Sequence, residues 1–423
     1  MNQPKSIKTI VCISPDSWRG LFRSRQQVMS RLAKDFRIIY LEPGRLVGEN
    51  QLKSAMGAAK NFFNISTYQP MDNITVVTGV PLLPHFRTQL PESVLKFSYP
   101  FISRINYSYT KRHFKRALKE LEVEDPIIWL CGFGDYGMDA HRFFDDLDNS
   151  LACYQVYDES PDFAHNRRIQ KQLRNADDVT CKKADVVITT SKSQFDRREG
   201  LNPNMFFTPN GVNFPLFNSP MVEDIPLPAD IADLPKPIIG FSGWMGYQID
   251  VPLLIKVANK YANGSVVLLG PNEIPRTPEL KTFMGMPNVH FLGRKQPQEM
   301  PSYFQAFDAA TIPYVMAGHT RYIYPLKLHE YLAAGRTVVS TDLPNLYPHK
   351  DLVHIAMSHD EYLDQLDEAI HDYSPEAIQA RTKLARKYSW DDRVKEIKEI
   401  LEQHLDAKHG SVESQESVIE TSL

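Results

Sequence analysis

Short β-branched runs recur along the chain with helical segments between them, and this alternation constrains the fold more than any other feature. The first series of runs covers residues 9–14, 37–42, 74–79, 126–131, 151–158, 186–191 and 205–209. Most of these runs do not alternate with polar residues, which is typical of strands that helices cover on both faces. The first half of the chain is therefore predicted to be an α/β domain with a doubly wound parallel sheet.

The pattern stops at residues 217–236, where four prolines stand among acidic side chains, and then restarts. Such a composition is typical of a connecting segment. The second series of runs covers residues 238–242, 265–270, 289–293, 308–313, 337–341 and 353–356. A chain of 423 residues also exceeds the length at which one core keeps growing. We therefore expect two Rossmann-like domains, at residues 1–216 and 237–389, joined by a linker at 217–236.

Two open parallel sheets in tandem bind ligands at the carboxyl ends of their strands. We therefore expect the two domains to face each other across a cleft that holds the site. Helices are predicted to close the chain, the last of them over residues 390–406. The polar residues 407–423 are expected to form a flexible tail.

Bulk composition excludes several classes of protein. The formal charge of −3 gives no reason to expect nucleic acid as a partner. The cysteines are scattered in or beside apolar runs, which favours buried reduced thiols and a cytoplasmic location: Cys12, Cys131, Cys153 and Cys181. No apolar run approaches the roughly 20 residues needed to cross a bilayer, and no early signal segment is present. Any membrane contact is expected to be peripheral, at the inner face.

One acidic side chain stands out in the stretch 324–341, which reads as a short helix, a glycine stop and a buried strand. Pro325 suits the first helical turn and Gly335 suits the left-handed residue that ends a helix. Lys327 and Glu330 are three residues apart and share one face of this helix. A carboxylate can accept hydrogen bonds from two adjacent ribose hydroxyls, while the cation neutralises a phosphate. The alternative is an exposed pair that adds a few tenths of a kcal/mol to its helix.

Glycines follow three predicted strands of the second half. Backbone approaches a ligand closely where side chains are absent, and helix amino termini beyond such loops attract anions. This pattern favours a nucleotide diphosphate, although each glycine alone can simply turn the chain. The predicted donor contacts are Gly243, Trp244, Gly270, Gly293, Arg294, Lys295, Leu326 and Leu328.

Several motifs in this order resemble the GT-B glycosyltransferases of the family 4, or group 1, type that build bacterial surface polysaccharides. The motifs are Ala184-Asp-Val-Val-Ile-Thr-Thr-Ser191, Pro209-Asn-Gly-Val212, Gly240-Phe-Ser-Gly243, Leu269-Gly-Pro271, Phe291-Leu-Gly293, Pro325-Leu-Lys-Leu-His-Glu-Tyr-Leu-Ala-Ala-Gly335 and Tyr388-Ser-Trp390. The resemblance implies a nucleotide-sugar donor in the second domain, an acceptor in the first and a last helix that crosses back. It also implies a retaining reaction, in which the departing phosphate deprotonates the acceptor, and it places Glu330 on the donor ribose.

Two departures from that family concern charge. Tyr322 stands where the family often has a second glutamate, and the loop Gly243-Trp-Met-Gly-Tyr-Gln248 lacks the usual arginine and lysine. Either other cations offset the phosphate charge or catalysis is weakened. The candidates are Arg321, Lys327, Arg294 and Lys295, and we predict Glu330, Lys327 and Arg321 as the catalytic set.

The first domain offers candidate acceptor contacts at the ends of its strands. They are Trp18, Arg23, Arg25, Asp135, Tyr136, Asp158, Glu159 and His165. An acid at a strand end can bind a sugar hydroxyl or receive the acceptor proton. The alternatives are that the arginines cap a helix and bond Asp16, that the acids are solvated, and that His165 is structural.

Two further segments carry competing interpretations. Gly132-Phe-Gly134-Asp-Tyr-Gly137 follows a strand and fits the dinucleotide fingerprint, with Asp158 as the late acid. Residues 96–119 interleave aromatic and basic side chains, as at a surface that meets anionic lipid headgroups. The alternative for residues 96–119 is an amphipathic helix packed on its own sheet.

We therefore expect a glycosyltransferase that moves a sugar from a nucleotide diphosphosugar, with UDP as the first expectation, to a glycan or lipid-linked glycan. No metal or other cofactor is expected, because no Asp-x-Asp pair follows a strand and cations can replace it. The alternatives are an NAD-binding or nucleotide-sugar epimerase-like enzyme and a catalytically silent nucleotide-sugar-binding protein.

Overall fold

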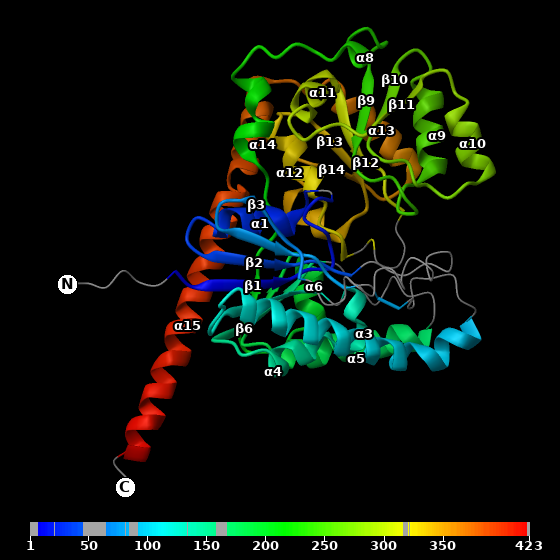
Figure 1. The fold of residues 1–423 in the computed structure, drawn as a ribbon. Coiled ribbons are helices and arrows are strands. Elements are labelled where there is room, and N and C mark those ends of the chain that lie inside the picture. The colour runs from blue at the N-terminus through cyan, green and yellow to red at the C-terminus, as the bar shows by residue number, and fades with distance from the viewer. Residues whose placement is uncertain are drawn as a thin grey trace. The chain divides into compact units, whose positions relative to one another are not determined.

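The computed structural model describes residues 7–20, 22–44, 65–80, 82–83, 92–132, 134–157, 167–315, 320 and 322–420, with backbone alone for 92–99, 134–137 and 409–420. The chain forms two compact units (Figure 1). Unit 1 comprises Met1–Thr208 and Val394–Leu423, and unit 2 comprises Pro209–Arg393. The chain therefore leaves unit 1 after Thr208 and returns to it after Arg393.

Unit 1 is built on one sheet, whose described strands have the order β3-β4-β2-β1-β5-β6-β7-β8. The strands are β1 (Thr9–Ile13), β2 (Arg37–Leu41), β3 (Thr67–Met71), β4 (Ile74–Val77), β5 (Ile127–Cys131), β6 (Leu151–Val156), β7 (Val186–Thr189) and β8 (Met205–Phe207). All neighbours pair in parallel except β3 and β4, which are antiparallel. The edge strand β3 was not predicted, because it contains Pro70 and alternates between exposed and half-buried residues.

Helices cover this sheet, and its interior is apolar. They are α1 (Ser24–Leu32), α3 (Glu92–Glu120), η3 (Gly134–Arg142), α4 (Phe143–Asp146), α5 (Arg167–Lys183), α6 (Lys192–Arg197) and most of α15 (Trp390–Glu420). Tyr107 and Phe114 of α3 pack with Phe143 in the core of unit 1. All four cysteines are buried and free, as expected for reduced thiols.

Unit 2 is built on a fully parallel sheet, whose described strands have the order β11-β10-β9-β12-β13-β14. The strands are β9 (Ile238–Ser242), β10 (Ser265–Leu269), β11 (Val289–Gly293), β12 (Ala309–Ile312), β13 (Val338–Thr341) and β14 (His354–Ala356). The chain first adds β10 and β11 on one side of β9, and then places β12 on the other side. The carboxyl ends of β9 and β12 are therefore the topological switch point of this sheet, where ligands bind in such folds.

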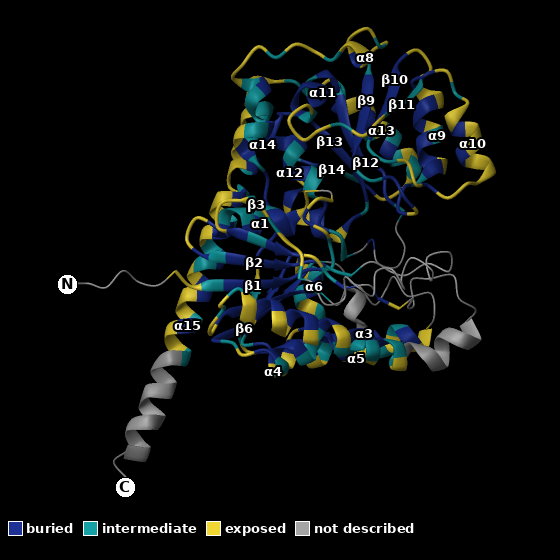
Figure 2. Cartoon of the chain, in the orientation of Figure 1, coloured by how far each residue is buried: buried dark blue, intermediate teal, exposed yellow. Residues whose placement is uncertain are grey.

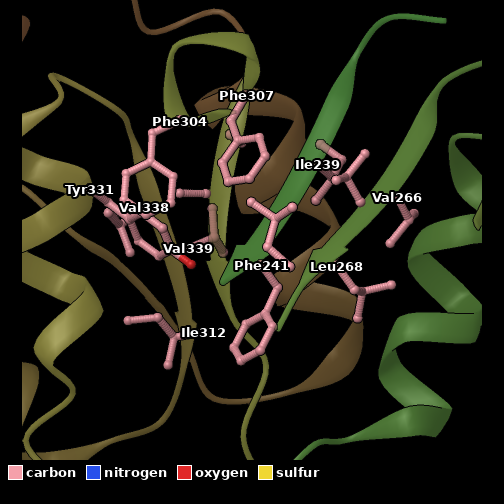
Figure 3. Packing of buried hydrophobic residues seen from close by; sticks show 14 of the residues in the cluster. Ile239, Phe241, Val266, Leu268, Phe304, Phe307, Ile312, Tyr331, Val338 and Val339 are labelled. Carbon is pink, nitrogen blue, oxygen red and sulfur yellow. The ribbon is translucent and has the colours of Figure 1, made fainter. Parts of the chain in front are cut away.

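The helices of unit 2 are α7 (Phe214–Phe217), η5 (Ser219–Met221), α8 (Ala229–Ala232), α9 (Val251–Lys260), α10 (Pro278–Met284), α11 (Met300–Ala306), α12 (Leu326–Ala333), η7 (Pro344–His349), α13 (His359–Ala369) and α14 (Pro375–Arg386). Side chains of β9 and β12 meet those of α11 and α12 in one core (Figure 3). The strands β9, β10, β12 and β13 are buried, whereas exposed residues follow the outer face of α10 (Figure 2).

The predicted linker is not a bare connection. Phe217 stacks on Phe304 with ring centroids 5.6 Å apart, and Ile231 of α8 is fully buried in the core of unit 2. Unit 2 thus begins at Pro209, and residues 217–236 belong to it. At the other end of the chain, α15 runs to Glu420 where a flexible tail was expected from residue 407. Helix formers such as alanine, lysine, glutamate and glutamine in that segment permit this extension.

No described helix combines the length and the apolar character needed to span a bilayer.

Candidate active site

The switch point of unit 2 places backbone, a cation and a carboxylate close together. β9 ends at Ser242 and continues into Gly243, while β12 is followed by Tyr314. Helix α12, which carries Lys327 and Glu330, lies between β12 and β13 in the chain. The site is therefore assembled from segments that are about 80 residues apart in sequence, as the topology of a parallel sheet dictates.

The glycines that end β9, β10 and β11 all have positive φ angles, of 134° at Gly243, 131° at Gly270 and 70° at Gly293. Neighbouring loops are tied by backbone hydrogen bonds, because the Gly243 N–H donates to Leu269 O at 2.8 Å and the Gly270 N–H donates to Gly293 O at 2.8 Å. These two N–H groups are therefore already used within the protein. Gly243 and Gly270 thus permit close packing of the loops, whereas a Cβ on Gly293 would meet nothing within 4 Å.

Gly270 gives the first testable prediction. A Cβ atom at this position would lie 2.1 Å from Gly243 O, and its φ is one that other residues rarely adopt. Gly270→Ala is expected to destabilise unit 2 by about 2 to 3 kcal/mol, measured by urea unfolding. The matched control is Gly285→Ala, where the new Cβ would lie 3.4 Å from Lys281 O at a negative φ. Equal effects of the two substitutions would contradict this account of Gly270.

Lys327 is held at the switch point by aromatic side chains from both strands. Its Nζ donates to the Tyr314 hydroxyl at 2.5 Å and lies 5.1 Å from the ring centroid of Phe241. A Cβ on Gly243 would come within 3.1 Å of Lys327 Cε, so glycine leaves room for the lysine stem. The ammonium group therefore lies against the first loop of the unit, which itself lacks basic residues.

Glu330 lies one helical turn after Lys327 and is half-buried. Burial raises the pKa of its carboxyl group to about 7, although the nearby charge of Lys327 opposes this shift. Within the described part of the chain, no hydrogen bond or ion pair is made to the Glu330 carboxylate. A carboxylate with so perturbed a pKa and so few partners is typical of a functional site.

The remainder of α12 anchors these two side chains to the sheet. The Ser242 N–H at the end of β9 donates to the Tyr331 hydroxyl at 2.7 Å, and the Tyr331 ring meets Phe304 edge-on at 4.9 Å (Figure 3). Leu328, a predicted donor contact, is fully buried in the core, while Leu326 is half-buried. The sequence analysis did not single out Tyr314, Phe241 or Tyr331.

The other predicted donor contacts lie in different surroundings. Trp244 donates from Nε1 to Glu273 at 2.9 Å, and Arg294 is exposed. Lys295 forms an ion pair of 2.6 Å with Asp230 of α8 and lies 4.8 Å from the Tyr303 ring centroid. Arg321 lies outside the described residues. Of the predicted phosphate cations, the structure thus brings Lys327 to the switch point and uses Lys295 to hold α8.

In unit 1, the loop after β1 is organised by internal pairs. Arg25 is buried, forms an ion pair with Asp16, and lies 4.4 Å from the ring centroid of Tyr157. Arg23, at the start of α1, is half-exposed and lies 3.8 Å from the other oxygen of Asp16. The contacts of Arg23 and Arg25 therefore agree with the alternative stated above, in which these arginines bond Asp16.

Glu42, which the sequence analysis did not single out, holds the same loop. Its buried Oε1 accepts hydrogen bonds from Ser17 Oγ at 2.8 Å, from the Trp18 N–H at 2.7 Å and from the Tyr68 hydroxyl at 2.9 Å. The Trp18 side chain is buried against Tyr40. The signal available in the sequence was an acid at the end of a predicted strand, since residue 42 directly follows β2.

The remaining acceptor predictions have no described side chains. Asp135 and Tyr136 lie in the first part of η3, where the backbone alone is described, and Asp158, Glu159 and His165 lie outside the described residues. The dinucleotide fingerprint that begins at Gly132 leads into the 3-10 helix η3. The fingerprint requires an α-helix whose amino terminus receives the pyrophosphate, so the structure does not support that reading.

The two sheets are parallel apart from the edge strand β3, and each has helices around it and a switch point between its strands, which defines the GT-B fold. Solved structures agree over nearly the whole chain. A sucrose-phosphate synthase from Thermosynechococcus elongatus superposes with a TM-score of 0.67 at 14% identity, covering 95% of this chain and all of that one. An E. coli structure described as trehalose-6-phosphate bound with UDP-2-fluoro glucose superposes with a TM-score of 0.65 at 12% identity, covering 93% of this chain and 99% of the other.

Residues 236–372 match the family described as Glycosyl transferases group 1. A putative teichuronic acid biosynthesis glycosyltransferase, TuaH of Bacillus subtilis (strain 168), is 26% identical over 179 residues. That match covers 41% of this chain and 42% of the relative, so the chain spans less than half of the relative's length. The expected GT-B fold and the expected resemblance to group 1 glycosyltransferases are thereby confirmed.

Proposed function

We propose that this protein is a glycosyltransferase that moves a sugar from a nucleotide diphosphosugar to a glycan acceptor during the synthesis of a surface polysaccharide. The observation that carries the proposal is the pair formed by Lys327 and Glu330 at the switch point of unit 2. A carboxylate with few partners suits a ribose diol, and an adjacent cation suits a diphosphate. The group 1 family match and the similarity to a teichuronic acid glycosyltransferase support the same class of reaction.

In the proposed reaction, Glu330 accepts hydrogen bonds from the donor ribose and so fixes the position of the nucleotide. Lys327 then neutralises the phosphate charge that grows as the glycosidic bond breaks. We expect no metal, because the lysine supplies this positive charge. The resemblance to the group 1 glycosyltransferases implies that the departing phosphate takes the acceptor proton, and we therefore propose a retaining reaction with a UDP-sugar as the first donor to test.

A ligand panel tests this proposal directly. Thermal shift with UDP, GDP, dTDP, CMP and NAD, followed by calorimetry, is expected to show binding of one nucleoside diphosphate and none of NAD. Glu330→Gln is expected to weaken that binding, while the matched control Glu273→Gln, which removes the charge from the carboxylate that accepts from Trp244, is expected to leave it within about threefold. Stabilisation by NAD would favour a dinucleotide enzyme. Binding without hydrolysis or transfer would favour a silent binding protein.

A lipid-linked acceptor would require contact with a membrane, and we propose α3 as the contact surface. Its outer face exposes two aromatic side chains, Phe101 and Tyr109. The same face exposes a row of cations at Arg104, Arg112, Lys115 and Lys119. Tyr107 and Phe114, which were part of the predicted basic aromatic stretch, are instead buried in the core. Side chains at 92–99 are outside the described set. Exposed aromatics among cations suit anionic headgroups above acyl chains.

Liposome flotation tests this surface. At low salt the protein is expected to float with vesicles that contain an anionic lipid, and replacing the four cations by glutamine should weaken binding by about 1 kcal/mol per charge. The control carries the same number of substitutions at exposed lysines of unit 2, namely Lys281, Lys350, Lys383 and Lys387. An equal loss of vesicle binding in the α3 variant and in the control would show a nonspecific charge effect. If the wild-type protein does not float with these vesicles, α3 is an ordinary amphipathic helix packed on its own sheet.

A further inference from the structure

The two chain crossings, which we define as residues 209–213 and 388–393, are paired with each other. The Val212 N–H donates to Tyr388 O at 2.8 Å, and the Trp390 N–H donates to Val212 O at 3.0 Å. Gly211 lies directly against the Trp390 ring, since a Cβ atom there would be 2.8 Å from the ring carbon Cδ2. The two segments by which the chain passes between its units thus form one hydrogen-bonded element.

This element is attached to the helix that carries the candidate active site. The Tyr388 ring stacks on the His329 ring, with centroids 4.1 Å apart and planes inclined by 15°. Asn210, from the first crossing, donates from Nδ2 to Tyr324 O at 3.2 Å, just before α12 begins. His329 directly precedes Glu330 on α12, so the stack and the candidate ribose ligand move with the same helical turn.

His329 itself is held in a buried polar cluster. It is fully buried, and its Nε2 lies 2.6 Å from the Tyr324 hydroxyl, which lies 2.9 Å from Nε2 of His349. The hydroxyl therefore donates to one imidazole and accepts from the other. Burial, together with the nearby His349 and Arg393, holds the pKa of His329 well below its ordinary value, so the ring that faces Tyr388 is neutral. A neutral ring fixed at its edge and stacked on its face has little freedom to move independently of α12.

We propose that His329 is a positioning residue, and that its stack on Tyr388 transmits occupation of the Lys327 and Glu330 site to both chain crossings. The inference rests on the proposed function, because it requires a nucleotide to bind at Glu330. A bound nucleotide restrains α12, the His329 ring restrains Tyr388, and the Tyr388 carbonyl restrains the Val212 amide. An effect of ligand binding can reach a second site only through a physical connection. These contacts connect the Lys327 and Glu330 site with the two chain crossings.

Hydrogen exchange at the Val212 and Trp390 amides measures this connection. His329→Gln removes the ring stack, whereas His329→Phe keeps a ring but loses the hydrogen bond to Tyr324. Without ligand, we expect exchange at the crossings to be about tenfold faster in the glutamine variant and close to wild type in the phenylalanine variant. His290→Gln, a substitution of the same chemistry on β11, is the matched control and should exchange as wild type does.

A second arm adds the nucleoside diphosphate that binds most tightly, beginning with UDP. In the wild type, the ligand is expected to slow amide exchange both in residues 326–333 and at the crossings. In His329→Gln, it is expected to slow exchange in residues 326–333 alone. Equal protection of the crossings in both proteins, or phenylalanine behaving as glutamine does, would overturn the role of the stack. Should His329→Gln fail to fold, Tyr388→Leu removes the same stack from the other side.

The outcomes separate the two proposals. Wild-type protection that stays confined to residues 326–333 would overturn the transmission and leave the proposed function standing. An absence of protection anywhere in the wild type would overturn the proposed function, and the transmission with it.

Discussion

Replacement of Lys327 by methionine is expected to lower the turnover of sugar transfer by roughly 100- to 1,000-fold while the protein remains folded. The ammonium group lies against the Gly243 loop and the Tyr314 hydroxyl, where the leaving diphosphate would develop its charge. Methionine keeps the length and the apolar stem of the side chain, so packing on Phe241 is largely preserved. Steady-state kinetics with a nucleotide diphosphosugar measure the effect, which should fall mainly on kcat.

Lys295→Met is the matched control for this experiment. Lys295 was also a candidate phosphate cation from sequence, but its ion pair with Asp230 assigns it to the packing of α8. Its replacement is expected to leave turnover within about threefold of wild type and to cost less than about 1 kcal/mol of stability. The reverse ranking of the two variants would show that the diphosphate lies toward β11 instead of α12.

The second large effect is the pH dependence of donor binding. The carboxyl group of Glu330 has a pKa of about 7 and must be ionised to accept two ribose hydroxyls. Affinity is therefore expected to fall, by at most about tenfold per pH unit, as the pH is lowered from 7 to 5, and to level off above pH 8. Calorimetry should use an intact nucleotide diphosphosugar, because the terminal phosphate of a free nucleoside diphosphate itself titrates near pH 6.

Glu330→Gln separates this effect from other titrations. The variant should bind more weakly than wild type at pH 8 and should show no dependence between pH 5 and pH 8. An equally steep profile in wild type and variant would assign the titration to another group.

The same raised pKa has a consequence for folding, with a definite sign. The folded state holds the proton of Glu330 more tightly than the unfolded chain, whose glutamate has the ordinary value of 4.5. Stability is therefore lost as the pH rises from 4.5 to about 7, where the folded carboxyl ionises despite its burial. Glu330→Gln should be more stable than wild type at pH 8, by on the order of 1 to 3 kcal/mol, and about equal at pH 4. Urea unfolding at the two pH values checks both expectations.

The sequence was sufficient for the two sheets because their strands are buried on both faces and are therefore continuous apolar runs. It was insufficient for β3, whose half-exposed residues and Pro70 resemble a loop. It also misplaced the border between the units. Proline among acids is typical of a connection, but Phe217 and Ile231 have partners far along the chain that no local pattern reveals.

Within the candidate site, the placement of Glu330 and Lys327 on one short helix was predictable, because a proline start and a glycine stop define that helix. Tyr314 and Tyr331 were not, because each acts through a contact across the sheet: one with Lys327, the other with the end of β9. The role of His329 was not predictable for the same reason, because the residues near it in sequence do not indicate that its ring stacks on Tyr388. The spacing of residues in the sequence therefore predicts which side chains share a helix face, whereas the order of the strands in the sheet determines which residues those side chains contact.

The packing of residues 217–236 onto unit 2 also sets a rule for recombining this protein with its relatives. A chimera joined at residue 237 would replace the stacking partner of Phe304 and the carboxylate that neutralises Lys295. A junction at residue 209 transfers both with the sheet on which they rest. Grafting of unit 2 between homologues is therefore best attempted with the earlier breakpoint.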